Sequence, residues 1–149
     1  MGSAARVVSI PSPIGTISAR LDDTGLLFLG FGDEPGAEPP AYLAAGLAAY
    51  LGGDLAALEL IPLSSALRLK PVHEELRRIP PGETLTYTEL ARRAGAGNAR
   101  GAGAVCAANP VSLVIPCHRA VGKDGSLRGC GWGLDRKAWL LRHEGALRA

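Results

Sequence analysis

Cys117, His118 and Arg119 place a thiol directly beside two basic side chains, in the stretch NPVSLVIPCHRAVGK. A cysteine acts as a nucleophile when it is a thiolate, and adjacent cationic or hydrogen-bonding groups favour that form in a poorly solvated site. Successive side chains on an extended chain point to opposite faces, so we expect His118 to reach the sulfur through a water molecule or a turn. Glu144, in the last predicted helix, would orient His118. Such a relay of nucleophile, base and orienting group suits a cysteine hydrolase as well as an acceptor of alkyl groups.

The other cysteines predict neither a metal centre nor a disulfide framework. Cys106 and Cys130 bring the total to three, an odd number without CxxC spacing, and the chain has only three histidines. Cys106 stands among small apolar residues, where a thiol is usually an inert small side chain. Cys130 lies in a glycine-rich loop, so a structural role is expected and a secondary reactive role stays open. A reducing cytoplasm suits this pattern best.

Composition indicates a globular chain with two unequal halves. Its 149 residues are 47% hydrophobic, enough for one ordinary domain or for a small domain joined to a compact lobe. No apolar run approaches the roughly 20 residues of a membrane span, and no signal peptide pattern opens the chain, so we expect a soluble protein that is not exported. Residues 1–64 carry 2 Lys/Arg and 7 Asp/Glu, whereas residues 65–149 carry 14 and 7. The basic half favours a polyanionic partner, although basic residues on helix faces are often plain solvated surface.

A shift in composition near residue 63 predicts a boundary between lobes at residues 1–63 and 64–149. In the first lobe, β-branched clusters over residues 6–32, separated by the turn sequences SPIG and DDTG, predict a short antiparallel meander. Residues 40–51 begin with a proline and predict a helix, followed by DLAALELIPL as a further strand or an extended connection. The apolar stripe expected on that helix consists of Tyr42, Leu43, Leu47, Tyr50 and Leu51.

The second lobe is predicted to be mostly helical. Thr86 followed three residues later by Glu89 forms a capping-box pattern at the start of one short helix. Asn98 is the expected N-cap of a second helix, made of small residues and ending at Asn109. Two short helices joined by a glycine-containing turn resemble a helix-turn-helix, although small-residue helices also occur wherever helices pack closely. The expected fold is α+β, with a small N-terminal antiparallel-sheet lobe carrying a helix and a mostly helical C-terminal domain containing the helix-turn-helix.

The stretch NPVSLVIPCHRAVGKDGSLRGCGWG, with TYTELA before it and RKAWLLRHEG after it, resembles the O6-alkylguanine-DNA alkyltransferases, also called methylated-DNA–protein-cysteine methyltransferases. The resemblance covers residues 67–145 in an unbroken order of motifs, and Asn-Pro, an apolar run and Pro-Cys-His-Arg together form a specific signature. It implies a ribonuclease-H-like N-terminal lobe and a DNA repair protein that flips O6-alkylguanine out of duplex DNA. The alkyl group would move irreversibly to the protein's own cysteine, once per molecule and without a cofactor or metal. The implied partner is the minor groove of double-stranded DNA, and a cytoplasmic monomer is expected.

The resemblance also implies roles for single residues. Cys117 would be the alkyl acceptor, His118 its base through a water molecule, Glu144 the residue that holds His118, and Asn109 the residue that shapes the turn before the thiol. Tyr87 would press on the phosphate beside the flipped nucleotide and offer its hydroxyl to the guanine ring.

DNA contact is implied for the second helix of the helix-turn-helix. Arg100 stands at the position of an arginine finger that fills the gap left in the base stack, although without the resemblance a solvated arginine would be the simpler interpretation. The small residues after it would let the helix backbone approach the sugar-phosphate wall. They are Gly101, Ala102, Gly103 and Ala104.

The implied substrate pocket includes Ser112, Arg119, Gly131 and Trp132, beside Tyr87, and Arg119 is expected to brace the lobes or the loop rather than to do chemistry. Several of its residues depart from the pattern of many relatives. The indole of Trp132 should narrow the pocket, and Ser112 replaces a proline that stacks on large substituents, so we expect O6-methylguanine to be preferred over benzyl-sized adducts.

Three other classes of protein share parts of this pattern. An alkyltransferase-like binding module flips damaged bases but lacks the acceptor thiol, and Cys117 argues against it. A sequence-specific helix-turn-helix regulator should carry polar base-reading side chains where this second helix carries Ala and Gly. A cysteine hydrolase would turn over repeatedly and would tolerate the loss of Arg100.

Overall fold

The structure is a computed structural model that describes residues 5–127 and 132–147. The chain divides into two compact units, Met1–Arg68 with Pro110–Val114, and Leu69–Asn109 with Ile115–Ala149. This division differs from the boundary expected after residue 63. The chain stays with the first unit beyond that point because the N–H of Ser64 donates to the carbonyl oxygen of Leu26 at 2.8 Å.

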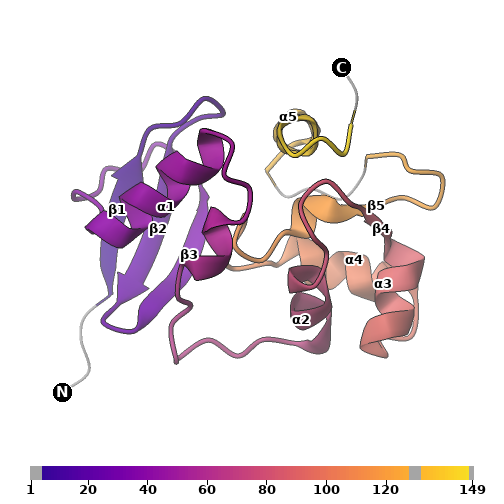
Figure 1. The fold of residues 1–149 in the computed structure, drawn as a ribbon. Helices are drawn as coiled ribbons and strands as arrows, with labels where there is room; N and C mark the ends of the chain where they lie inside the picture. Colours follow the sequence, from indigo (N-terminus) through magenta and orange to yellow (C-terminus); the bar gives the residue numbers. More distant parts are fainter. Residues whose placement is uncertain (1–4, 128–131, 148–149) are drawn as a thin grey trace. The chain divides into compact units, whose positions relative to one another are not determined.

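The first unit contains the expected antiparallel meander (Figure 1). Strands β1 (Arg6–Ile10), β2 (Ile17–Asp22) and β3 (Gly25–Phe31) pair in that order. Strands β2 and β3 each follow a turn rich in Pro, Gly or Asp, as the sequence predicts. A later part of the chain, residues 110–112, returns to β3 and pairs with it at Leu29.

Helix α1 (Ala41–Leu51) lies across this sheet in Figure 1 and completes the core of the first unit. Leu43, Leu47 and Tyr50 are buried, whereas Tyr42 is 40% exposed and Leu51 is half-buried. The predicted stripe was therefore too wide, because Tyr42 lies on the exposed side of the helix. The segment predicted as a strand or extended connection contains instead a 3-10 helix, η1 (Ala57–Leu60).

The second unit is mostly helical, which together with the first unit makes the fold α+β as predicted. Its elements, in chain order, are α2 (Pro71–Arg77), β4 (Leu85–Thr86), α3 (Tyr87–Ala94), α4 (Ala99–Ala107), the 3-10 helix η2 (Cys117–Arg119), β5 (Ala120–Val121) and α5 (Leu134–His143). The two short strands pair in parallel, with Leu85 opposite Ala120. This pairing was not predicted, and it brings the start of α3 beside the end of η2.

Helices α3 and α4 form the predicted helix-turn-helix and pack against each other (Figure 1). The Oγ1 atom of Thr86 accepts from the N–H of Glu89 at 3.1 Å, and the Oδ1 atom of Asn98 accepts from the N–H of Gly101 at 2.9 Å. Both predicted N-caps are confirmed. Gly95 ends α3 with φ 66°, a left-handed conformation that glycine adopts without strain.

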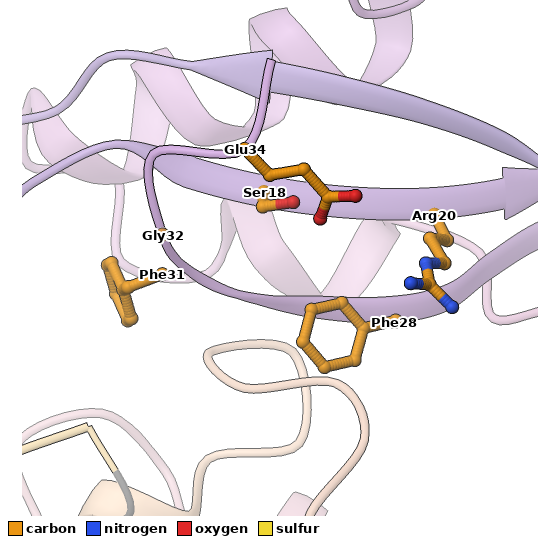
Figure 2. A pocket seen from close by; sticks show the side chains of 6 residues that line it. All are labelled: Ser18, Arg20, Phe28, Phe31, Gly32 and Glu34. Carbon is orange, nitrogen blue, oxygen red and sulfur yellow. The ribbon is translucent and has the colours of Figure 1, made fainter. Parts of the chain in front are cut away.

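A cavity of about 210 Å³ opens within the first unit, at β2, β3 and the segment after β3 (Figure 2). None of the residues around it belongs to the site predicted from the sequence. They are Ser18, Arg20, Phe28, Phe31, Gly32 and Glu34. Over the part of the chain that the structure describes, no helix has both the length and the apolar character needed to cross a membrane.

Candidate active site

The loop that carries Cys117 is shaped by a tight turn at Pro116. Pro116 has φ −80° and ψ 68°, and the N–H of Cys117 donates to the carbonyl oxygen of Ile115 at 2.8 Å, the geometry of an inverse γ-turn. The same carbonyl oxygen accepts from the Nδ2 of buried Asn109 at 2.7 Å. The carbonyl oxygen of Ile115 thus ties Asn109, which follows α4, to the turn that carries the thiol. Cys117 itself is half-buried at the start of η2.

A buried network lies directly after the thiol. The Nε2 atom of His118 is 2.9 Å from Oε2 of Glu144, and both side chains are almost completely buried. Arg119 donates from Nε to Oε1 of Glu144 at 2.8 Å and from Nη2 to Oε2 at 2.9 Å. Its Nη1 donates to the carbonyl oxygen of Ile79 at 2.7 Å. Three guanidinium nitrogens are therefore used inside the second unit, where Arg119 holds the carboxylate of Glu144 and the backbone at Ile79.

The protonation states of this network follow from burial and charge. Burial lowers the pKa of His118, and the hydrogen bond and charge of Glu144 oppose that effect without cancelling it. Burial alone would raise the pKa of Glu144, but hydrogen bonds from His118 and Arg119, together with the charge of Arg119, hold that pKa well below its usual range. Near neutral pH the pair is a neutral imidazole on a carboxylate. The carboxylate accepts from Nε2–H, so the other ring nitrogen of His118, Nδ1, keeps its lone pair and is available as a base.

Lys137 is a site residue that the sequence interpretation missed. It is 0% exposed, its Nζ lies 3.1 Å from the hydroxyl oxygen of Tyr87, and it lies 5.3 Å from the centre of that ring. Its charge also lowers the pKa values of His118 and Cys106, although burial dominates at both residues. A signal was present in the sequence: Lys137 falls at helical spacing with Leu140, Leu141 and Glu144, on the buried side of α5. A lysine on such a stripe is rarely a packing residue.

Cys106, the cysteine of α4, is not expected to react. Burial, with a smaller contribution from Cys117, raises the pKa of the Cys106 thiol to about 12, while Lys137 opposes the shift. At neutral pH Cys106 stays protonated, as expected for a small buried side chain.

Helix α4 exposes some of the residues predicted to bind DNA and buries another. Arg100 and Ala104 are exposed, whereas Ala102 is 0% exposed and packs into the second unit. The side chain of Ala102 therefore faces the core side of the helix. Its expected role, a close approach of the helix backbone to the sugar-phosphate wall, stays a prediction. A Cβ atom at Gly103 would meet nothing within 4 Å, whereas one at Gly101 would lie 3.0 Å from the carbonyl oxygen of Ala96.

The remaining predicted pocket residues lie in different parts of the chain. Ser112 is buried and belongs to the first unit. Trp132 is half-buried, and its carbonyl oxygen accepts from Nη1 of Arg136 at 3.0 Å. Gly131 and Cys130 lie outside the described residues. Within residues 5–127 and 132–147, no three His, Cys, Asp or Glu side chains are grouped so as to hold a metal ion.

Comparison with known proteins covers both units. Residues 69–146 match the family described as 6-O-methylguanine DNA methyltransferase, DNA binding domain. The methylated-DNA–protein-cysteine methyltransferase of Salmonella typhimurium is 42% identical over 111 residues, 72% of this chain and 65% of that protein. The enzyme of the same name from Mycolicibacterium paratuberculosis is 37% identical over 148 residues, 91% of this chain and 90% of that protein.

Solved structures agree with these sequence matches. The crystal structure of Mycobacterium tuberculosis O6-methylguanine methyltransferase superposes with a TM-score of 0.81 at 30% identity, covering 98% of this chain and 96% of that chain. A crystal structure of Mycobacterium tuberculosis OGT in complex with DNA gives a TM-score of 0.80 at 31% identity, with 94% and 92% covered.

Fold and site together define an α+β protein in which a helix-turn-helix unit carries a thiol beside a buried His–Glu–Arg network. The chain belongs to the 6-O-methylguanine DNA methyltransferase family, whose relatives are the methylated-DNA–protein-cysteine methyltransferases. It spans about two thirds of the length of the Salmonella relative and most of the length of the mycobacterial one.

Proposed function

We propose that this protein repairs DNA by moving the alkyl group of O6-alkylguanine, chiefly O6-methylguanine, irreversibly to the sulfur of Cys117. The observation that carries the proposal is the position of Cys117 at the head of η2, directly before a neutral His118 held 2.9 Å from Glu144. The names of the relatives, and the DNA complex of the Mycobacterium tuberculosis structure, support the same activity and partner.

Helix α4 delivers the substrate in this proposal. Exposed Arg100 enters the minor groove of double-stranded DNA and fills the space that the flipped guanine leaves. Gly103 and Ala104 add little bulk on the helix surface, so the backbone approaches the sugar-phosphate chain. A base that pairs poorly is easier to extrude than a normal guanine, which favours the lesion without reading base edges. One monomer is sufficient for this arrangement.

The chemistry starts with removal of the thiol proton. It passes from Cys117, through a water molecule, to Nδ1 of His118, and Glu144 stabilises the resulting imidazolium through Nε2. The thiolate sulfur then attacks the alkyl carbon in line, so that the S–C bond forms while the C–O6 bond breaks and its electron pair stays with guanine. Asn109 and the Pro116 turn hold the backbone beneath the sulfur during this step.

Tyr87 serves the leaving guanine. Its hydroxyl gives its proton to the guanine ring as negative charge develops there, and the Lys137 ammonium, 3.1 Å from the hydroxyl oxygen, stabilises the phenolate that remains. The thioether product has no leaving group that this site could expel, so one molecule of protein is consumed per lesion. The reaction suits a reducing cytoplasm, where the acceptor remains a thiol.

The test is transfer of label from a duplex that contains radiolabelled O6-methylguanine. We expect one methyl group per protein molecule on Cys117, no transfer to Cys117→Ala, and normal transfer to Cys106→Ala, the matched change at a buried thiol. Repeated release of label would indicate a hydrolase instead. Binding of the duplex without transfer would indicate a module that only recognises damage.

A further inference from the structure

Leu113, four residues before the acceptor, has an unusual backbone conformation. Its φ is 72°, and no other non-glycine residue in the described ranges has a positive φ. The N–H of Val114 donates to the carbonyl oxygen of Ser112 at 2.9 Å, so Leu113 is the centre of a γ-turn of the rare, strained kind with positive φ. A non-glycine residue pays conformational energy in this region, and such residues cluster at functional sites.

Hydrogen bonds hold the chain on both sides of this turn. Before it, the N–H of Leu29 in β3 donates to the carbonyl oxygen of Pro110, and the N–H of Ser112 donates to the carbonyl oxygen of Leu29, both at 2.9 Å. After it come the bonds to the carbonyl oxygen of Ile115 described above and the second γ-turn at Pro116. The chain therefore makes two γ-turns in succession, centred on Leu113 and on Pro116. Of these two residues, Leu113 has the strained positive φ.

The Leu113 side chain is 3% exposed, so its burial offsets the strain of the backbone. A glycine would reach φ 72° without strain but would contribute no buried side chain. We propose that Leu113 is a positioning residue for alkyl transfer: its positive φ sets the path of the backbone into the Pro116 turn, and so the place of the Cys117 sulfur. The inference rests on the proposed alkyl transfer, and it concerns the backbone angle rather than the leucine side chain.

Substitutions can separate the backbone angle from side-chain packing. Leu113→Ile keeps volume and apolar character, but a β-branched residue strongly resists positive φ. Leu113→Met, the matched control, keeps a similar volume and is not branched at Cβ. Leu113→Gly removes the side chain and accepts the angle freely. If the angle positions the sulfur, the transfer rate at saturating DNA should fall at least about tenfold in Leu113→Ile and stay within about threefold of wild type in Leu113→Met and Leu113→Gly.

Two further measurements distinguish positioning from stability. Leu113→Gly should melt at the lowest temperature of the three because it leaves a cavity, and yet transfer faster than Leu113→Ile. The DNA concentration for half-maximal rate should not change in any variant. If Leu113→Ile fails to fold, Leu113→Gly and Leu113→Ala decide the question. Both remove the buried part of the leucine side chain beyond Cβ, and of the two only alanine disfavours a positive φ. Transfer by Leu113→Gly should then be the faster.

The opposite order overturns the inference. If Leu113→Ile transfers as fast as Leu113→Met, if Leu113→Ala transfers as fast as Leu113→Gly, or if the rates follow side-chain volume, Leu113 acts only by packing. The proposed function still stands in that case, as long as the wild type transfers the methyl group to Cys117. Failure of the wild type to transfer a methyl group would refute the proposed function itself, and this inference with it.

Discussion

The carboxylate of Glu144 lies 2.9 Å from the Nε2 of His118, in a pair that is almost fully buried. Arg119 donates two hydrogen bonds to the same carboxylate. The Glu144 side chain therefore orients the base, His118, and also neutralises the charge of the Arg119 guanidinium. A buried carboxylate with these two duties should be sensitive in both stability and chemistry.

Replacing Glu144 tests both duties. In Glu144→Gln the charge of Arg119 stays buried without its counter-ion, so we expect the free energy of unfolding to fall by about 3 kcal/mol, measured by urea titration. The transfer rate should fall as well, because the imidazolium of His118 loses its stabilising charge. An unfolding free energy within about 1 kcal/mol of wild type would show that the carboxylate charge matters little to the fold.

The rate of alkyl transfer should depend on pH through His118. Its pKa is lowered from 6.5, chiefly by burial, so the base stays neutral below the pH at which an ordinary histidine is protonated. We expect the single-turnover rate to stay level as pH falls to 6.5 and to decline only below it, as Nδ1 takes up a proton from solvent. A decline centred above pH 6.5 would contradict this protonation state.

His73 gives a separate dependence of stability on pH. Its Nδ1 accepts from the N–H of Lys70 at 3.0 Å, Nε2 is buried with no hydrogen-bond partner, and burial lowers its pKa from 6.5. The folded state therefore binds fewer protons than the unfolded state below pH 6.5. The stabilising contribution of neutral His73 is complete above pH 6.5 and is lost as pH falls toward the folded-state pKa.

We expect the unfolding free energy of the wild type to fall between pH 7 and about pH 5, and to fall less in His73→Leu. Equal slopes in wild type and His73→Leu would show that His73 does not titrate with unfolding.

Arg100 should act in delivery of the base and not in the chemistry. Arg100→Ala should slow repair of O6-methylguanine in duplex DNA by about tenfold or more, because the stacked duplex closes without the inserted side chain. Reaction with the free O6-methylguanine nucleoside should be unchanged. Arg142→Ala removes the same charge from an exposed position on α5 and should repair duplex DNA normally. Equal losses of rate on duplex DNA and on the free nucleoside would show that Arg100 acts in the substrate pocket and not in delivery of the base.

Gly103 should destabilise α4 relative to alanine and at the same time allow the helix to approach DNA more closely. Because a Cβ atom there meets nothing within 4 Å, Gly103→Ala should stabilise the protein by about 0.5–1 kcal/mol through helix propensity. Gly101→Ala places its Cβ 3.0 Å from a carbonyl oxygen and should give no such gain. If α4 approaches the sugar-phosphate chain, Gly103→Ala should also weaken binding in a fluorescence anisotropy titration. Undiminished affinity would place the DNA elsewhere on the helix.

Lys137 should influence the rate more than the fold. Lys137→Met keeps the length and apolar stem of a fully buried side chain, so the unfolding free energy should stay the same or rise. The transfer rate should fall about tenfold, since Tyr87 loses the cation beside its hydroxyl. Tyr87→Phe is the matched change on the other partner, and adding Lys137→Met to it should have little further effect. If the rate losses of the two single variants were fully additive in the double variant, Lys137 and Tyr87 would act independently.

Local signals in the sequence predicted much of the fold and the acceptor. The turns of the meander and the caps at Thr86 and Asn98 depend on contacts within three or four residues, so composition and spacing were sufficient to find them. Cys117 and His118 were recognised in the same way, as neighbours in one motif. The same signals misjudged Tyr42, because a helical repeat predicts a stripe without showing which edge is covered.

Only the tertiary structure decided how distant residues combine. Tyr87 meets Lys137 across 50 positions, a contact that the sequence did not predict. The predicted contact of His118 with Glu144, across 26 positions, is present, but its distances and its burial come from packing. The pairing of residues 110–112 with β3, and the positive φ of Leu113 beside it, likewise depend on a strand far back in the chain. Such contacts arise when whole elements bury their apolar faces together, and no local spacing encodes which polar groups are then enclosed. The sequence by itself therefore determined the thiol and its helix-turn-helix, whereas packing decided what charges, hydrogen bonds and backbone angles surround that thiol.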